Sequence, residues 1–525
     1  MADNKTEVEK LETLIERAKK REIREEGDRH LFKKALGDIQ GNVLAGYKGL
    51  SAASFHYLTF RPNMARPWLK AVQQKGCLTK QRACDDQDKE IAPTFNVAFT
   101  CEGLRQLGVH PDYIDQLSDP FRSGMQARSE KLNEGDKSLG DTDASAPDKW
   151  QDPFKGSSLH ALVTVHTRQH SNCDEPAETP FPDLLTSEKY LAYYRVQQAA
   201  WLKDHTEHFG FKDGIGRPRI RGAQRDLDNP KRSVQENCRY ADRPIALGEF
   251  LLGYETDGTN RQIRGAPVGT PAYDLTKNGT YMVYRKLEQD VASFRKFVYE
   301  RSGGDEKKAN LLAAQIIGRW RDGTPLLLNP LGTSHVNERD LDAFDYDTPR
   351  RNDFAIDEND GLCPLGAHVR RMNPRKKHLA THKRRILRRG VPYGPPLPNW
   401  GADNEERGLI FIALNSSIEE QFEFLQSRWA NSGNFRGLNS YERDPLIGAN
   451  DGSERSQFRI RGEHICRNLP RFVTVKGGAY LFVPSLTALA GLSKGSFSKG
   501  FSTGETQHAA TQQGEAIERA ISKSR

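Results

Sequence analysis

A basic stretch from Leu362 to Gly394 carries the residue types best suited to chemistry. It reads LCPLGAHVRRMNPR, continues through a basic connector and ends in ILRRGVPYG, and no Asp or Glu falls between His368 and Gly394. An imidazole set among lysines and arginines suits a pocket for an anionic group that bears a metal. The alternative reading is a solvated basic face that happens to contain histidines, since His378 and His382 lie in the connector.

A second stretch far upstream, EHFGFKDGIGRPRI, contains the pattern GxxDG with Asp213 as its acid. Alone this pattern is weak, because three specified residues recur in ordinary turns. In this order, however, the two stretches resemble the dye-decolorizing peroxidases, a family of haem enzymes. In that family GxxDG supplies a distal aspartate, and the histidine of a C-P-x-x-A-H-x-R-x-x-N-P-R segment is the axial iron ligand. An arginine shortly before P-Y/F-G completes the distal side. The segment IQGN near the start, residues 39–42, is also typical of the family.

The resemblance assigns roles to three residues. It implies that His368 ligates the iron of one haem b per chain, and a neutral imidazole leaves the sixth coordination site open for peroxide. Asp213 would shuttle a proton, and Arg388 would stabilise negative charge on the departing oxygen. Arg388 lies four residues before Pro392, as the family spacing requires, whereas Arg389 is one step off. If this segment is extended, only one of the two arginines should enter the pocket.

Two points about the iron ligand stay open in the sequence. Cys363 precedes a proline, and such a thiolate can also bind haem, although in the resembled motif this cysteine is a buried small residue. A proximal histidine normally donates its second ring N–H to a carboxylate or carbonyl. Asp444 and Asp451, in ERDPLIGANDG, are the candidates, and a backbone carbonyl is a third possibility.

Further residues are candidates for contacts with the cofactor and the electron donor. Haem propionates bind arginine or lysine, and Arg370, Arg371 and Arg375 follow His368 within one or two helical turns. Leu409 and Phe411 alternate on a strand-like segment and could wall the peroxide side. If the pocket is closed to bulky donors, electrons must travel from the surface, and the aromatic residues Trp429 and Tyr441 are possible relays.

Two other groups of histidines invite a metal-site reading. His205 and His208 flank Glu207 just before GFKDG, but without a third ligand we interpret them as a surface turn. His160 and His166 share one face of a predicted strand, where structural roles are favoured for the same reason.

The function implied is a peroxidase. It would use hydrogen peroxide to oxidise dyes, phenols or other aromatic donors in one-electron steps through a ferryl-porphyrin radical intermediate. An acidic optimum is expected, because a carboxylate with a pKa near ~4 remains a base where an imidazole with a pKa near ~6.5 is protonated. The alternative is a haem-binding or haem-handling protein with little turnover, although mere binding needs neither Asp213 nor Arg388.

Composition bounds the class of protein. The 525 residues allow two domains, and 36% apolar with 28% charged residues indicate a soluble chain. No signal-like or membrane-spanning apolar run is visible, and seven scattered cysteines suggest no disulfide framework, so we expect a cytoplasmic protein. The net charge of +8 is spread among acids outside the basic stretch, which argues against nucleic-acid binding. A homo-oligomer is possible.

The elements that position these residues follow an α+β pattern. We predict an N-terminal helical extension (1–37, with an amphipathic helix from about Thr6 to Glu26), a first domain (38–225), a second domain (240–493) and a polar tail (494–525). Residues 119–153 and 225–243 read as loops, and the C-terminal FVTVKGGAYLFVPS reads as a pair of strands. Two rounds of strand, helix and strand suggest a duplication. The resemblance implies two ferredoxin-like domains with antiparallel sheets and flanking helices, and haem between sheet and helices, held mainly by the C-terminal domain.

Overall fold

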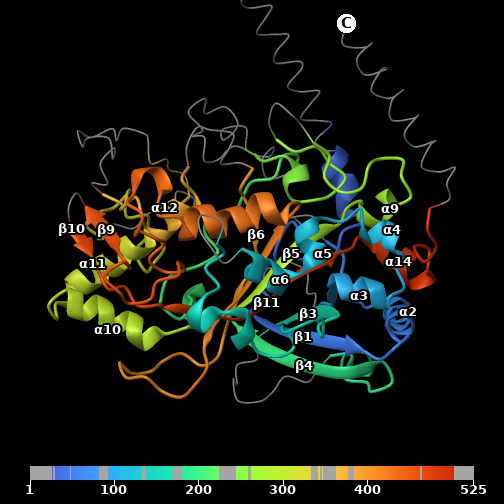
Figure 1. Cartoon of the computed structure of the whole chain (residues 1–525), viewed down its shortest axis with the longest axis horizontal. Helices are drawn as coiled ribbons and strands as arrows, with labels where there is room; N and C mark the ends of the chain where they lie inside the picture. Colours follow the sequence, from blue (N-terminus) through green and yellow to red (C-terminus); the bar gives the residue numbers. More distant parts are fainter. Residues whose placement is uncertain are drawn as a thin grey trace, which may run out of the picture.

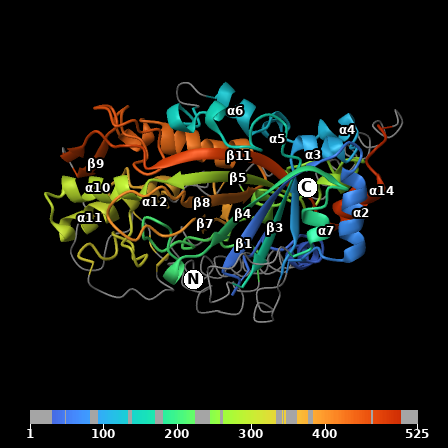
Figure 2. The ribbon, with the colours of Figure 1, turned by 90° about the horizontal axis from the view of Figure 1, so that it is seen from below.

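A nine-stranded antiparallel sheet runs through the molecule (Figures 1 and 2). The computed structural model describes residues 27, 30–47, 49–81, 93–132, 138–168, 180–223, 244–257, 262–332, 341–342, 344, 346, 362–375, 383–461 and 464–501. The strands of the large sheet are β1 (Ala52–Phe60), β2 (Asn96–Phe99), β3 (Ala161–Thr167), β4 (Leu191–Ala200), β5 (Thr280–Gln289), β6 (Leu387–Arg388), β7 (Val391–Tyr393), β8 (Gly408–Asn415) and β11 (Val473–Val483). A separate ribbon pairs β9 (Phe458–Arg461) with β10 (His464–Cys466).

The order of the strands reveals the duplication. The sheet runs β4-β1-β3-β2-β11-β5-β8-β6, with β7 also paired to β8. Counted along the chain within each half, with β6 and β7 taken together because both pair with β8, both halves follow the order fourth, first, third, second, which is the ferredoxin-like arrangement. The halves join where β2 pairs with β11, through Phe99 opposite Phe482. The predicted fold class is therefore confirmed.

Helices cover the sheet and its two ends. They are α2 (Ala65–Lys75), α3 (Cys101–Gln106), α4 (Pro111–Ile114), α5 (Asp119–Ser123), α6 (Met125–Lys131), α7 (Pro182–Leu185), α9 (Tyr273–Thr276), α10 (Val291–Arg301), α11 (Glu306–Ile317), α12 (His368–Met372) and α14 (Leu486–Lys494). A wide-turn π-helical segment spans Ile418–Glu423 and Leu425–Asn431, and short 3-10 turns lie at Asp143–Ser145, Pro147–Lys149, Lys203–His205, Leu247–Glu249 and Phe435–Gly437. Helices α10 and α11 lie at one end of the molecule, and α2 and α14 lie at the other (Figure 1).

Apolar periodicity explains the main helices. In α10, Val291, Phe294 and Val298 recur at helical spacing and are buried, while the Asp290 side chain caps the first turn by accepting from Ser293 N. Leu287 continues the same spacing toward the N-terminus, so the sequence pattern alone would include it in the helix, but it lies in β5. The Asp290 cap explains the difference, because it fixes the first helical residue at Val291.

Two predicted segments are wrong. Residues 119–153 do not form a surface loop, since they contain α5 and α6 and bury Phe121, Met125 and Trp150. The C-terminal segment is one strand, β11, whose register shifts between Val475 and Gly477. The two errors have one cause. A Cβ on Gly477 would lie 2.2 Å from Phe154 Cδ2, and a Cβ on Gly478 would lie 2.3 Å from Met125 Sδ. Gly477 and Gly478 therefore do not end the strand. Their lack of a side chain lets residues 119–153 pack against it.

Several predictions fall on residues outside the described ranges. They concern the helix at Thr6–Glu26, the loop at Arg225–Arg243, His378, His382 and most of the polar tail. Within the described ranges, no helix is long and apolar enough to cross a membrane.

Candidate active site

One cavity of about 280 Å³ collects the predicted site residues from both halves of the chain. His368 comes from α12, Asp213 from the loop after β4, and Arg388 from β6. Leu409 and Phe411 of β8 also line it, so the expected strand alternation places both side chains on the cavity side.

His368 is held by a buried carboxylate. Its Nδ1 lies 2.9 Å from Asp444 Oδ2, and the Asp444 side chain is fully buried. The other carboxylate oxygen of Asp444 accepts from the backbone amides of Leu446 and Ile447, each at 2.9 Å. Burial alone would raise the pKa of Asp444, but His368 and these hydrogen bonds hold it below its usual value. The sequence left open whether Asp444 or Asp451 contacts His368, and the structure places Asp444 there. Asp451 instead accepts a hydrogen bond from Ser456.

Asp213 and Arg388 form an ion pair at the cavity wall. Arg388 Nη1 donates to Asp213 Oδ1 at 2.9 Å, and Nη2 donates to the Ile215 carbonyl at 2.9 Å. The backbone amide of Gly214 donates to the same Asp213 oxygen at 2.6 Å. Burial opposes ionisation of Asp213, yet Arg388 and the Gly214 amide lower the pKa of this carboxyl group below its usual value. The carboxylate form therefore persists in mild acid.

Arg389 points away from this cavity. Its guanidinium donates to the carbonyls of Asn42 at 2.8 Å and of Val43 at 2.9 Å, and it is absent from the lining described above. Consecutive residues of an extended segment face opposite sides, which is why only Arg388 reaches Asp213.

Glu207 is a cavity residue that sequence reasoning missed. Its carboxylate accepts from the amides of Phe209 and Phe211, each at 2.9 Å, and from Gln289 Nε2 at 2.6 Å. Burial raises its pKa despite these bonds. The surface turn expected at His205–His208 is wrong for Glu207, whose carboxylate anchors the loop that carries Asp213. The one sequence feature that pointed to Glu207 is its position six residues before Asp213.

The predicted propionate arginines separate into two groups. Arg375 lines the cavity and is braced by Asp342 and the Phe344 carbonyl. Arg370 does not line it, and this prediction is corrected: its guanidinium donates to the Cys363 carbonyl and lies 4.7 Å from the centre of the Tyr346 ring. Arg371 is fully buried and donates to the backbone carbonyls of residues 429, 432 and 442. Besides Arg375 and Arg388, five arginines line the cavity: Arg285, Arg319, Arg384, Arg385 and Arg471.

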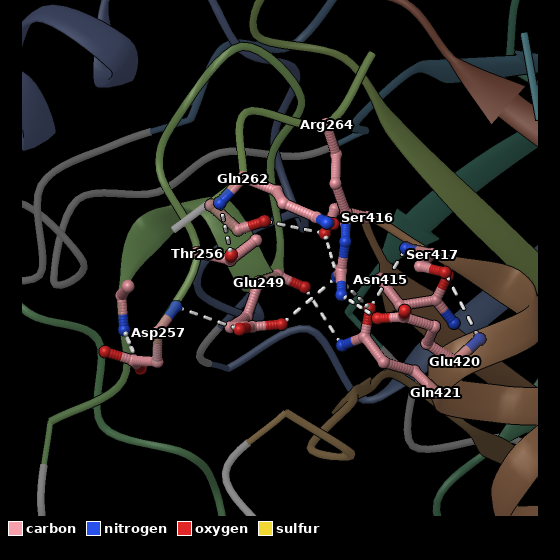
Figure 3. A network of polar contacts seen from close by, with 12 residues as sticks. Glu249, Thr256, Asp257, Gln262, Arg264, Asn415, Ser416, Ser417, Glu420 and Gln421 are labelled. Atoms are coloured by element: carbon pink, nitrogen blue, oxygen red, sulfur yellow. Dashed lines mark hydrogen bonds and ion pairs between the residues drawn. The ribbon is translucent and has the colours of Figure 1, made fainter. Parts of the chain in front are cut away.

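A buried polar network holds the segment that leads to Arg388 (Figure 3). The side chain of Glu249 is fully buried and pairs with Arg264 Nη1 at 3.1 Å, while burial raises its pKa. Arg264 also donates to Gln421 Oε1 at 3.2 Å, and Gln421 Nε2 donates to the carbonyls of Glu249 and Arg385 at 3.0 and 2.5 Å. The network therefore ties the backbone before Arg388 to the π-helical segment.

The mispredicted segment 119–153 also contributes to the cavity. Asp141 lines it and forms two hydrogen bonds with Arg285 of β5, at 2.8 and 2.6 Å. Both side chains are almost fully buried. No sequence motif marks Asp141, because its partner lies 144 residues away.

The competing metal and thiolate readings find no support in the described residues. Cys363 is fully buried beside Phe344 and Ala367 and does not line the cavity. His160 Nδ1 accepts from the backbone amide of Phe60, and no group of three or more His, Cys, Asp or Glu side chains within the described ranges could hold a metal ion. None of the four cysteines in those ranges forms a disulfide.

The proposed relay residues lie outside the cavity lining. Trp429 is half-buried between the rings of Phe424 and Phe435, with centroid distances of 5.6 and 6.3 Å. Tyr441 is 44% exposed. Trp429 follows Gln426, which does line the cavity, by less than one helical turn. This arrangement is compatible with a path from the surface, and the relay stays a prediction.

The residues present fit a haem. His368 has Nδ1 fixed by a carboxylate, and no described residue hydrogen-bonds its Nε2, which is the arrangement of an imidazole ligand to iron. The cavity is largely apolar around Leu409, Phe411 and Phe422, and its arginines suit two propionates.

Comparisons with known proteins agree with this geometry. Residues 38–180 match the model of the DyP dimeric alpha+beta barrel domain, and residues 251–445 match the C-terminal model of the Dyp-type peroxidases. A dye-decolorizing peroxidase of Mycetinis scorodonius is 28% identical, and one of Auricularia auricula-judae is 26% identical, each match covering 86% of both chains. The solved structure of an ancestral D-type dye decolorizing peroxidase superposes with a TM-score of 0.69 at 27% identity, over 88% of this chain and 99% of that one. The chain therefore belongs to the dye-decolorizing peroxidases, the haem b enzymes that oxidise dyes with hydrogen peroxide.

Proposed function

We propose that His368 is the axial ligand of the haem iron and that Asp213 and Arg388 form the peroxide-cleaving pair. The observation that carries this proposal is the convergence of the Asp213–Arg388 ion pair and the His368–Asp444 hydrogen bond on one cavity. Haem, when bound, supplies the iron at which peroxide reacts and stores the oxidising equivalents. We propose Arg375 as a partner of a propionate, and Leu409 and Phe411 as the apolar wall that excludes bulky donors.

The two distal side chains divide the work. The Asp213 carboxylate is a base that can take a proton from peroxide and return it to the departing oxygen. The Arg388 guanidinium, already fixed by Asp213 and the Ile215 carbonyl, can donate to the oxygen on which negative charge grows. A protein that only stored or handled haem would require neither group, so this pair disfavours the alternative of little turnover.

The lowered pKa of Asp213 supports an acidic optimum. The carboxylate is the working form of the base, and it is lost only as pH falls through a pKa held below the ordinary aspartate value. Aromatic or phenolic donors, a homo-oligomer and a cytoplasmic location stay predictions from the sequence.

Rapid mixing with hydrogen peroxide tests the proposed roles. Wild type, Asp213→Asn, Arg388→Leu and His368→Ala are compared for haem content and for the rate of the absorbance change. We expect the two distal variants to keep haem and to react about 100- to 1000-fold more slowly, and we expect the His368 variant to bind haem weakly. Distal variants that react at the wild-type rate would contradict the assignment.

A further inference from the structure

A second cavity of about 100 Å³ adjoins the active site. It shares Asp213, Gly216, Ile386 and Arg388 with the main cavity, and its other lining residues do not line that cavity. Its polar lining includes Arg389, His166 and Tyr47, and its apolar lining includes Leu50, Trp201, Pro218 and Val391. We call it the side cavity.

The side cavity has more positive than negative charge. Arg388, Arg389 and Arg217 line it, whereas Asp213 is the one carboxylate among its described lining residues and already binds Arg388. The guanidinium of Arg389 donates to three backbone carbonyls, and no described carboxylate pairs with it. Burial and the two neighbouring arginines lower its pKa to about 9, so it still carries its charge at neutral pH. Each terminal nitrogen of Arg389 has a second hydrogen beyond the one that it donates to a backbone carbonyl.

His166 supplies an unused hydrogen-bonding group in the same lining. Its side chain is 7% exposed, and Nδ1 is buried without a partner. Its other nitrogen, Nε2, lies 3.5 Å from the amide nitrogen of Asn42, at the limit of a hydrogen bond. Burial lowers the pKa of His166 to about 4, so the ring is neutral near pH 7. Buried polar atoms in proteins nearly always have partners, so the unpaired Nδ1 of a residue in the cavity lining is a candidate contact for a ligand.

The dimensions and walls restrict the ligand. A water molecule needs roughly 10–15 Å³ by the same measure of volume, so the side cavity holds several water-sized groups but not a dye. Apolar and aromatic side chains cover part of the wall, and a guanidinium binds a carboxylate through paired hydrogen bonds. We propose that the side cavity is a binding site for a small monocarboxylate, with Arg389 and His166 as the residues that recognise it.

The site would be coupled to the active site by its geometry. A carboxylate seated beside Arg388 competes with Asp213 for the same guanidinium. We therefore expect occupancy to slow the reaction with peroxide without any change in the ligands of the iron. Binding itself does not depend on the roles proposed for Asp213 and Arg388, and it can be measured in the absence of turnover.

Calorimetric titration of the haem-loaded protein with sodium acetate is the test. Acetamide, a neutral molecule of the same shape, is titrated in parallel at constant ionic strength, and the haem absorbance is recorded throughout. Wild type should show saturable binding of one acetate and none of acetamide. Arg389→Gln and, independently, His166→Leu should weaken acetate binding by about tenfold or more, as expected for the loss of a charged or buried donor. Arg105→Gln removes an arginine that is half exposed and outside the side cavity, and it should bind as wild type does.

Haem content and melting temperature show which variants are folded. If Arg389→Gln unfolds, His166→Leu still decides the question, because its ring makes no strong hydrogen bond in the fold. Absence of saturable binding in wild type would overturn the proposal, as would equal affinity in the folded variants. Acetate binding that shifts the haem spectrum and survives both substitutions would also overturn it, because it would indicate binding at the iron. If wild type binds acetate but does not react with peroxide, the binding site would be supported and the catalytic roles proposed for Asp213 and Arg388 would be rejected.

Discussion

The contact between His368 and Asp444 gives the sharpest test of the site. Replacing Asp444 with Asn keeps an oxygen for the amides of Leu446 and Ile447 but removes the negative charge that faces His368 Nδ1. A hydrogen bond to a charged group contributes about 1.5–3 kcal/mol. Loss of such a partner typically lowers metal affinity by about 10- to 100-fold, which corresponds to about 1.4–2.7 kcal/mol. We expect Asp444→Asn to lose haem faster by a factor in this range.

The assay is transfer of haem to an excess of a haem-free acceptor globin, followed by absorbance. A redox titration gives a second readout, since a less basic imidazole should raise the reduction potential of the iron. Asp451→Asn is the matched control, because Asp451 is in the same segment but binds Ser453 and Ser456. The reasoning is refuted if Asp444→Asn keeps its haem as long as wild type does, or if both variants lose it equally.

Three further predictions follow from particular contacts. Arg388 is the strongest influence that lowers the pKa of Asp213. Arg388→Leu should therefore move the acidic limb of the pH–rate profile for the reaction with peroxide to higher pH. A limb that stays at the same pH would mean that a group other than Asp213 titrates there. Glu423→Ala should lower the free energy of unfolding, measured by urea titration, by about 3–5 kcal/mol, because the buried Arg128 loses the carboxylate that lies 2.5 Å away. A change below about 1 kcal/mol, which is the value of an exposed ion pair, would argue against this. Trp429→Phe should reduce turnover of a bulky dye while leaving the reaction with peroxide intact, and unchanged dye turnover would remove the relay.

Local patterns predicted much of the fold and the site. Strand-like alternation predicted β3 and β8, and the period of two in an extended chain predicted that Arg388 and Arg389 would face opposite sides. Asp213 could be found only because its motif occurs together with that of His368, since a turn sequence alone has many uses. These predictions needed no knowledge of which segments meet in space.

Residues that act through distant partners escaped prediction. Nothing near Asp141 announces that Arg285 will bind it, and nothing near Gly477 announces that Phe154 will pack on it. Arg370 failed for a related reason, because helical spacing places it near His368 but the Cys363 carbonyl draws its guanidinium away from the cavity. The choice between Asp444 and Asp451 likewise depended on a contact across 76 residues.

The position of β11 in the sheet has a consequence for the order of events in the cell. It is the last strand among the described residues, yet it lies in the middle of the sheet, between β2 and β5, and its residues Val473 and Val475 line the main cavity. A nascent chain that already displays His368, Asp213 and Arg388 outside the ribosome still lacks this wall. Because a ribosome adds roughly 5–20 residues per second, the ligand-bearing segment waits for seconds before the cavity can close. We therefore expect haem to be retained only after β11 has been synthesised, and a truncation before Val473 should lose the cofactor along with the strand.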